Sequence, residues 1–546
     1  MVLVFNRQIA AFSVALALLL AACTPAPKGG APTQSGSAAE QPVTGGTLTF
    51  IVNAEPPSFD GHRETTFALL HPIAPHYSTL YKFDPNDLTK VIPDVAAAMP
   101  EYSADKLSAT IKLRTDVKFH DGSKMTSDDI VATYQKIIFP PTGVLSPRAG
   151  AYAAVESITN PAPDSVVFKL KYPSASFATN LASPWNFIYS AAKLKTDIHW
   201  YEKNIMGTGP YTYVSNTKGQ DWVGKKFPDY FAKDKNGVQL PYLDGYKALI
   251  ITDANAEVNA IRSKQAAIEF RGFTPQQRDT LSSALGTSLA IQEAPWICVN
   301  YVVPNTKKPP FDDVRVRQAL TLAIDRYAGS TALQKITIVK DVGGLMRPKG
   351  PFAQADADLQ KLAGFGTDGA ANKAKAKQLL ADAGYASGIK LTAVLLRSPQ
   401  NRTIMLEAMQ QQLKAVGIDL QLQFVESADL SKRRVDRNYQ LMGDNLTPSA
   451  EPDTYTYVEY HSKSSGNVGN YNDPALDQLL DKARVTTDPA QRKQALRDVQ
   501  LKLADLQFII TTGDPYYHSL FQPYLKGFRF SFVNQRIPIK YIWLDK

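Results

Sequence analysis

Alternating apolar and polar positions predict several strands in the N-terminal third of the chain. The stretch GGTLTFIV, residues 45–52, alternates β-branched or aromatic residues with small or polar ones, as half-buried strands do. Residues 109–113 show the same pattern and predict a second strand, and residues 117–119 predict a third. The Asp-Gly pair at 121–122 follows directly and predicts a tight turn.

Apolar positions at helical spacing predict helices in several later segments. Thr126 or Ser127 is expected to cap a helix that starts at Ile130, because hydroxyl side chains accept hydrogen bonds from a helix N-terminus. Residues 309–326 combine prolines, an aspartate cap and apolar positions at helical spacing. Residues 371–396 and 405–425 each read as a helix followed by a strand. These alternations predict an α/β fold whose second half has a largely parallel sheet.

The N-terminus carries an apolar run that is too short to cross a membrane. Residues 9–22 are uncharged and follow Arg7, whereas a membrane span needs roughly 20 apolar residues. A basic start, a short apolar segment and small residues are typical of an export signal, here residues 1–22. The sequence Leu-Ala-Ala-Cys that ends at Cys23 resembles the lipobox of bacterial lipoproteins, which implies a diacylated cysteine. The alternative is an ordinary signal beside an incidental cysteine.

Residues 23–45 are rich in Pro, Gly, Ser, Ala and Gln and offer little to bury. Such a composition predicts a flexible linker. At about 5–6 Å times the square root of its length, this linker would separate an anchored Cys23 from the folded part by roughly 25 Å.

Composition limits what the remainder can be. About 500 residues exceed what one hydrophobic core normally serves, so two or three lobes are expected. Cys298 is the one cysteine besides Cys23, and its apolar surroundings predict a packed thiol rather than a nucleophile. The formal net charge is +9, but the densest basic cluster, 431–437, is short and contains an aspartate. We therefore expect a solvated helix face there and no nucleic acid partner.

The common catalytic and metal-binding signatures are missing from the sequence. Seven histidines are scattered, without the local motifs of zinc hydrolases or serine hydrolases. His120 and Asp121 are adjacent and would point to opposite faces of a strand, so a structural role is favoured. His461 is a lone candidate metal ligand. We expect that the protein is not an enzyme and has no cofactor and no metal site. A hydrolase that uses a pair of carboxylates is the minor alternative.

Taken in order, eight phrases of the chain resemble a known family. They are GGTLTF, PDVAAAMPEYSADKLSATIKLRTDVKFHDGSKMTSDDIV, GTGPY, PYLDGY, PPFDDVRVRQALTLAIDR, AKQLLADAGY, QQLKAVGIDLQL and GNYNDPALDQLLDKA. Together they resemble the extracytoplasmic solute-binding proteins of ABC importers in the dipeptide, oligopeptide and nickel group, bacterial family 5. The resemblance covers more than 400 residues.

The resemblance implies an α/β, two-lobed, periplasmic-binding-protein-like fold of type II. Lobe I would comprise 46–293 and 511–546, with an extra subdomain at 83–206, and lobe II would comprise 294–510. The chain would cross between the lobes near 293 and near 511, which are the expected hinges. A bound ligand would favour the closed form, which would dock on a permease in the inner membrane. The protein would be a monomer. It would be anchored to a membrane outside the cytoplasm, in the periplasm or at the cell surface.

Ligand identity is where this sequence departs from the peptide-binding members of the family. In those members an aspartate in a phrase such as W-x-x-D-Y-x-D-P pairs with the peptide amino group, and Pro448 occupies that position here. Ser78 likewise stands where many members have a glutamate. Asp444 or Glu451 are the possible substitutes. A peptide remains the leading ligand class, with a non-peptide anion of the opine or sugar type, or a metal chelate such as a nickel metallophore, as the alternative.

The remaining site residues follow from the same resemblance. Arg397 would pair with a carboxylate or phosphate, unless it is a surface arginine on a loop. The aromatic residues of the set could stack on a ligand or could be plain core residues. The full set of candidate ligand-binding residues is Tyr77, Ser78, Trp296, Tyr301, Arg397, Ser398, Asn445, Leu446, Thr447, Tyr516 and Tyr517.

Overall fold

A computed structural model of the chain describes most residues from Gln41 onward. The described ranges are 41–87, 90–295, 299–327, 339–342, 344–346, 350–396, 400–446, 451–464, 466–508, 510–529 and 537–546. None of the helices in these ranges is both long enough and apolar enough to cross a bilayer. Cys23, Trp296 and Cys298 lie outside the described residues.

The strand predicted at the start of the folded part is confirmed as β1, Thr47–Val52. It runs parallel to β10, Gly245–Ile250, on one side and to β11, Ile268–Glu269, on the other. Two antiparallel strands extend this sheet beyond β10, namely β9 (Asp221–Lys226) and β8 (Tyr211–Thr217). Helices α1 (Phe67–Ile73), α5 (Ala254–Arg262) and α6 (Pro275–Leu285) complete this part.

A separate four-stranded antiparallel sheet lies within the segment expected to be the extra subdomain. Its order is β4 (Glu101–Tyr102), β5 (Ser108–Lys112), β7 (Ser165–Leu170) and β6 (Val155–Ala162). Together with α2, Ser127–Ile138, it encloses a hydrophobic core of its own that includes Ile111, Tyr134 and Phe168. The smaller elements here are β2 (Tyr81–Phe83), β3 (Val91–Pro93), α3 (Phe177–Leu181) and α4 (Ala191–Thr196).

Two local predictions in this segment need correction. Residues 117–119 form no strand but a single bridge between Lys118 and Lys124, because the turn at Gly122 follows so closely that the Phe119 amide already bonds the Ser123 carbonyl, 2.8 Å away. Helix α2 begins at Ser127 rather than at Ile130. Thr126 is its N-cap, in a capping box with Asp129.

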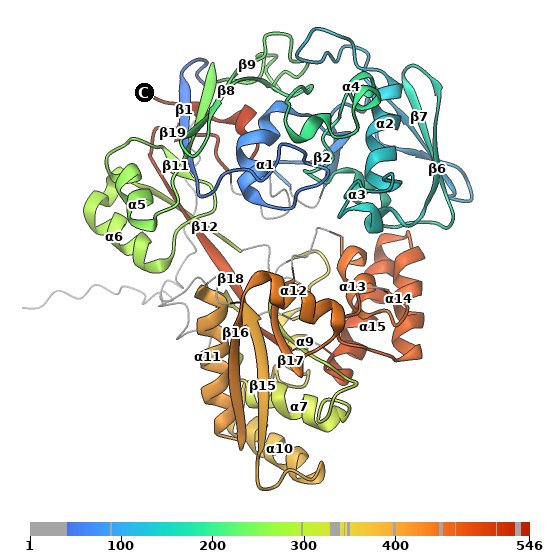
Figure 1. Cartoon of the computed structure of the whole chain (residues 1–546), viewed down its shortest axis with the longest axis vertical. Coiled ribbons are helices and arrows are strands. Elements are labelled where there is room, and N and C mark those ends of the chain that lie inside the picture. Colours follow the sequence, from blue (N-terminus) through green and yellow to red (C-terminus); the bar gives the residue numbers. More distant parts are fainter. Residues whose placement is uncertain are drawn as a thin grey trace, which may run out of the picture. The chain divides into compact units, whose positions relative to one another are not determined.

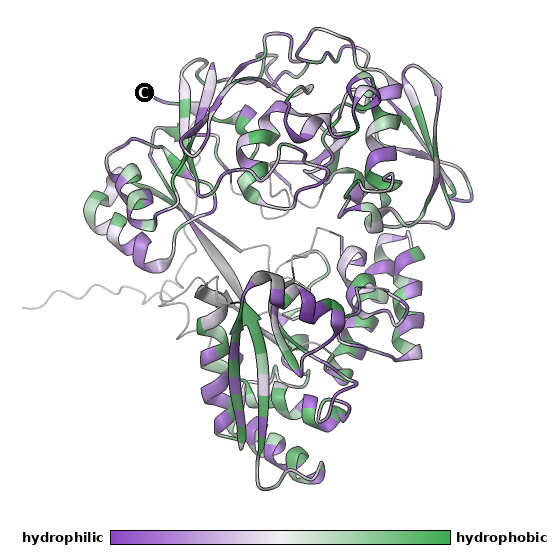
Figure 2. Cartoon of the chain, viewed as in Figure 1, coloured by the Kyte–Doolittle hydropathy of each residue, from purple (hydrophilic) through white to green (hydrophobic). Residues whose placement is uncertain are grey.

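The second half of the chain builds a mixed sheet. As predicted, β15 (Ile389–Leu396) runs parallel to β16 (Ile418–Val425), and also to β17 (Leu441–Leu446). The prediction of a largely parallel sheet is wrong for β13, Val299–Pro304, which is antiparallel to β17 and to β18, Ile510–Phe521. In Figure 2, β15 is mostly apolar, whereas α12, Ser427–Asp436, is mostly hydrophilic.

Helices flank this sheet in the order that the sequence predicts. Asp313 caps α7, and the helix before β15 is followed by glycines at 384 and 388. These helices, seen in Figure 1, are α7 (Val314–Ala323), α9 (Asp356–Leu359), α10 (Gly369–Asp382), α11 (Gln400–Lys414), α13 (Asp453–Tyr460), α14 (Pro474–Val485) and α15 (Pro489–Leu506).

One long strand, β18, belongs to both halves of the molecule (Figure 1). Its residues 510–513 pair with β13, and residues 516–521 pair with β12, Ala290–Pro295. Its middle pairs with β14, Val339–Asp341. The chain then returns to the first half, where β19 (Leu525–Lys526) pairs with β20 (Trp543–Leu544) and Leu525 joins the same core as Leu48.

Candidate ligand site

Asn445 and Leu446, two of the residues expected to line the cleft from the second half, lie at one edge of its sheet. Since β15, β16 and β17 are parallel, their carboxyl ends lie along the same edge, which is where open α/β sheets bind ligands. Asn445 and Leu446 are the last residues of β17, opposite Asn300 and Val299 of β13. Arg397 with Ser398 follows β15 and Thr447 follows β17, and these three lie outside the described residues.

Strand β18 brings two further candidates towards that edge. Asn300 of β13 pairs with Gly513, and Tyr516 and Tyr517 follow three and four residues later on the same strand, opposite Pro295 and Ala294 of β12. They therefore lie where the strand passes from one half of the molecule to the other. The backbone thus places Asn445 and Leu446 on β17 and Tyr516 and Tyr517 on β18, with β13 between the two strands.

Tyr301 has the surroundings of a core residue. It lies opposite Asp444 in the β13–β17 ladder, and only 3% of its surface is exposed. Burial, together with Asp444 and Glu459, raises the pKa of its phenol well above the ordinary value. The sequence allowed a core role or a cleft role for Tyr301, and its surroundings favour the core.

Tyr77 and Ser78 are enclosed by the first half of the chain. Tyr77 is fully buried and stacks on Phe187, with 4.6 Å between the ring centroids. Ser78 is buried too and donates a hydrogen bond to the Thr208 carbonyl, 3.0 Å away. The glycines on either side of Thr208 are required by this packing, since a Cβ at Gly207 or Gly209 would collide with the backbone of residues 75–77.

The two carboxylates considered as substitutes for the missing aspartate both contact arginines. Asp444 accepts a hydrogen bond from Arg434, whose guanidinium also lies 3.4 Å from Glu459. Burial raises the pKa of Glu459 to about 7 despite that contact. Glu451 is buried, and its carboxylate accepts hydrogen bonds from both terminal nitrogens of Arg492.

His120 and His461 make contacts of a structural kind. The His120 ring bonds the Gly209 carbonyl at 3.0 Å and accepts from the Gly207 amide at 3.4 Å, while Asp121 bonds Ser123. The structural interpretation of His120 is thus supported. His461 stacks on Tyr457 at 4.4 Å, and the described part of the chain holds no group of three residues suited to a metal ion.

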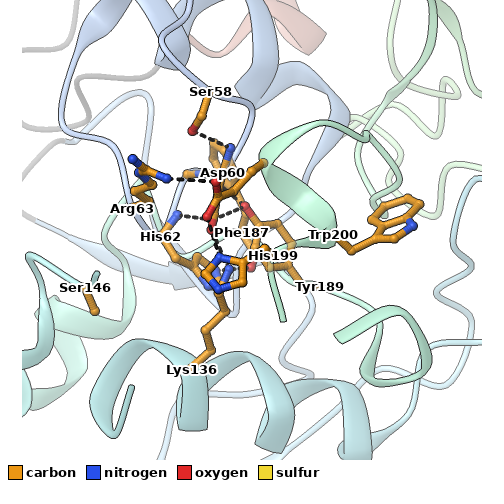
Figure 3. A network of polar contacts seen from close by, with 12 residues as sticks. Ser58, Asp60, His62, Arg63, Lys136, Ser146, Phe187, Tyr189, His199 and Trp200 are labelled. Atoms are coloured by element: carbon orange, nitrogen blue, oxygen red, sulfur yellow. Dashed lines mark hydrogen bonds and ion pairs between the residues drawn. The ribbon is translucent and has the colours of Figure 1, made fainter. Parts of the chain in front are cut away.

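A buried polar network holds the loop that follows the carboxyl end of β1 (Figure 3). Lys136 of α2 contacts Asp60 at 2.5 Å, and both side chains are at most 2% exposed. The Tyr189 hydroxyl donates to the other Asp60 oxygen at 2.9 Å, and the His62 ring lies 2.8 Å from the Phe187 carbonyl. This network fastens the loop to the four-stranded subdomain.

Arg148 completes the same network. Its guanidinium donates to the backbone carbonyls of Gly61, His62 and Glu64, at 2.5, 2.7 and 2.9 Å. The sequence did not predict this network. Its partners are 76 to 129 residues apart, and no local pattern marks such pairs.

A second contact joins the two halves of the chain away from β18. Arg484 of α14 lies over the rings of Tyr457 at 3.9 Å and Tyr172 at 5.2 Å, and 3.4 Å from Asp453. The Ala175 amide donates to the Arg484 carbonyl at 3.3 Å. Tyr172 and Ala175 follow β7 of the small sheet, so the subdomain touches α13 and α14 directly.

The sheet arrangement defines the class of protein. Solved structures of binding proteins share the fold: that of the oligopeptide-binding protein AppA from Bacillus subtilis with a nonapeptide covers 93% of this chain and 100% of its own, with a TM-score of 0.74 and 24% identity. The substrate-binding protein CtaP from Listeria monocytogenes covers 92% of this chain and 100% of its own, with a TM-score of 0.77 and 23% identity. The fold is thus the two-lobed type II fold of binding proteins, as predicted.

Sequence comparison identifies the family. Residues 90–469 match the model of the bacterial extracellular solute-binding proteins, family 5. The di/tripeptide-binding protein 2 of Pseudomonas aeruginosa is 27% identical and covers 90% of this chain and 93% of its own length. The oligopeptide-binding protein AppA of Bacillus subtilis is also 27% identical and covers 97% of both chains. The chain belongs to family 5 of the bacterial extracellular solute-binding proteins.

Proposed function

We propose that this protein captures a peptide, or a peptide-like small organic solute, between its two lobes and delivers it unchanged to an ABC permease. The observation that supports this most strongly is the family membership, since relatives matched over nine tenths of the chain are named for di/tripeptides and oligopeptides. The lobes are 46–293 with 511–546 and 294–510, with 83–206 as a subdomain. The pairing of β18 with both β13 and β12 supports this division.

The ligand would lie at the carboxyl ends of β15 and β17. Its proposed contacts are Arg397, Ser398, Asn445, Leu446, Thr447, Tyr516 and Tyr517. Among the described residues near this edge, Asp444 and Glu451 both contact arginines, so neither carboxylate offers a ready partner for a ligand's amino group. Arg397 offers a partner for a ligand's carboxylate.

This proposal predicts which end of a peptide matters. Isothermal titration of a tripeptide should show a larger loss of affinity when its C-terminal carboxylate is amidated than when its amino group is acetylated. Arg397→Ala should weaken binding of the free acid about tenfold or more. Arg433→Ala serves as the control, because Arg433 already pairs with Asp429 on the surface of α12.

The opposite ranking, with acetylation abolishing binding and amidation tolerated, would show that another residue replaces the missing aspartate. Native mass spectrometry of protein purified without refolding identifies the bound ligand directly. A ligand recovered with altered covalent structure would contradict the role as a binding protein and favour a hydrolase.

Membrane attachment through Cys23 is the second part of the proposal. Two acyl chains on a cysteine hold a protein on a membrane where one chain is marginal. Labelled palmitate should enter the wild-type protein in its host and should not enter Cys23→Ser, which should keep residues 1–22. Cys298→Ser is the matched control and should still be labelled.

A further inference from the structure

A pocket in the second half of the chain combines a buried cation with an unsatisfied amide. It lies between α7, α15 and the segment around α9, and it is partly open to solvent. Arg326 and Gln354 supply its polar wall, and Leu359, Leu362 and Phe365 line its apolar wall. None of these residues belongs to the ligand site described above.

No acidic residue is among the described residues that line this pocket around Arg326. Only 2% of its surface is exposed, and its guanidinium donates to the carbonyls of Thr511, Thr321 and Gly364 at 3.1, 3.0 and 2.6 Å. None of the carboxylates in the described ranges forms an ion pair with it. Burial therefore lowers the pKa of Arg326 to about 10. A buried charge that is hydrogen-bonded only to neutral groups is costly.

One N–H of the Arg326 guanidinium has no acceptor among the described residues. Its Nη2 atom can donate twice, and the one acceptor among the described residues is the Thr321 hydroxyl, 2.8 Å away. The ring of Phe365 lies beneath the guanidinium at 4.5 Å. The Arg326 side chain is therefore held rigidly, with one N–H left for an acceptor.

Gln354 is the second unsatisfied group. Both its amide oxygen and its amide nitrogen are buried, and neither has a partner within the described ranges. A buried amide without partners destabilises the fold, so a residue that served stability alone would be better apolar. The neighbouring Gln500 amide, by contrast, donates to the carbonyls of Phe352 and Leu496 at 3.1 and 3.2 Å.

We propose that this pocket binds a small monocarboxylate with a short apolar tail. The carboxylate accepts from the free N–H of Arg326 and from the Gln354 amide nitrogen, and so supplies the missing counter-charge. The tail lies against Leu359, Leu362 and Phe365. The site is independent of the proposed transport ligand, and its test does not require that ligand to be known.

The test uses 4,4,4-trifluorobutyrate as the probe, observed by ¹⁹F NMR with the full-length protein. We expect saturable binding with a dissociation constant on the order of 1 mM, as for other ligands of this size. The neutral amide of the probe should bind at least about tenfold more weakly, because it lacks the charge. Inorganic phosphate should not displace the probe at equal concentration, since it has no tail.

Variants locate the binding and separate it from folding. Gln354→Leu should weaken probe binding about tenfold while its melting temperature stays at or above the wild-type value. Gln378→Leu is the matched control, since Gln378 is exposed on α10, and it should bind the probe like the wild type. Gln354→Glu should lose binding as well, because it carries its own carboxylate beside Arg326.

Two results would overturn the proposal. Equal binding of the probe by wild type and Gln354→Leu would place it elsewhere, as an unspecific anion. A clear drop in the melting temperature of Gln354→Leu without any probe would show that the amide already has a partner.

Discussion

Replacing Lys136 by methionine tests whether the Asp60 network carries stability. Methionine keeps much of the lysine stem but removes the ammonium that contacts Asp60 at 2.5 Å, in a place where the two side chains are 1% and 2% exposed. Removing one partner of a buried ion pair leaves an uncompensated charge and costs about 3–5 kcal/mol. We expect the free energy of unfolding of Lys136→Met to fall by that amount.

Lys169→Met is the control in the same subdomain. Lys169 pairs with Glu156 at 3.1 Å, but the side chains are 61% and 46% exposed, so losing this pair should cost less than about 1 kcal/mol. Urea unfolding followed by circular dichroism measures both. The double variant Asp60→Asn with Lys136→Met removes both charges and should recover part of the loss, because the asparagine side chain keeps an acceptor for the Tyr189 hydroxyl.

The pH dependence of the deficit gives an independent check. In the wild type, burial opposes the ionisation of Asp60, but Lys136 and the hydrogen bond from the His62 backbone amide outweigh it and lower the pKa of the carboxyl. Without Lys136 that pKa rises, so the folded variant takes up a proton more readily, and the deficit should shrink as the pH falls from 7 to about 4. A stabilising role of the Asp60–Lys136 pair is refuted if Lys136→Met loses no more free energy of unfolding than Lys169→Met, or if the loss in Lys136→Met is independent of pH.

Three further changes test other parts of the structure. Arg492→Met leaves Glu451 buried and should cost about 3–5 kcal/mol in urea unfolding; a loss as small as that of the exposed Arg497→Met would contradict the buried pair. Burial lowers the pKa of His62 to about 3, so the histidine is protonated in the unfolded chain, but not in the folded one, as the pH falls below about 6.5. Between pH 7 and 5, His62→Gln should therefore lose about 2 kcal/mol less stability than the wild type. The same pH dependence of stability in both proteins would show that His62 is not buried in its neutral form. Gly209→Ala should prevent folding or lower the melting temperature strongly, because its Cβ collides with the backbone at Tyr77, whereas Gly150→Ala meets open space and should be neutral.

Local chemistry made much of the fold predictable from the sequence. The Asp313 side chain accepts from the Arg315 amide at the start of α7, and glycines with positive φ at 384 and 388 separate α10 from β15. Both features belong to short-range physics that a few neighbouring residues determine. The failed strand at 117–119 shows the limit, since alternation alone could not show that a turn would leave no room for a ladder.

The candidate site was less predictable, because burial depends on distant partners. Tyr77 and Ser78 are candidate ligand-binding residues by family position, yet they contact Phe187 and Thr208, which lie more than 100 residues away in the sequence. Conversely, the Asp60–Lys136 pair lies in no motif, and only the packing of α2 against the loop after β1 brings it together.

Strand β18 and the Arg484 contact, which both join the halves, limit how the proposed closure can occur. On β18, pairing with β13 ends at Gly513 and pairing with β12 begins at Tyr516, while the two residues between them pair with β14. A bend between Gly513 and Tyr516 would therefore spare the β13 and β12 ladders and disturb the short pairing with β14. The Arg484 contact with Tyr172 and Ala175 lies outside that strand. A rotation about the 513–516 segment must therefore either keep this contact near its axis or exchange it for another. In the second case, the cost of separating Arg484 from Tyr172 adds to the free-energy difference between the open and closed forms, which the ligand must overcome by its preference for the closed form.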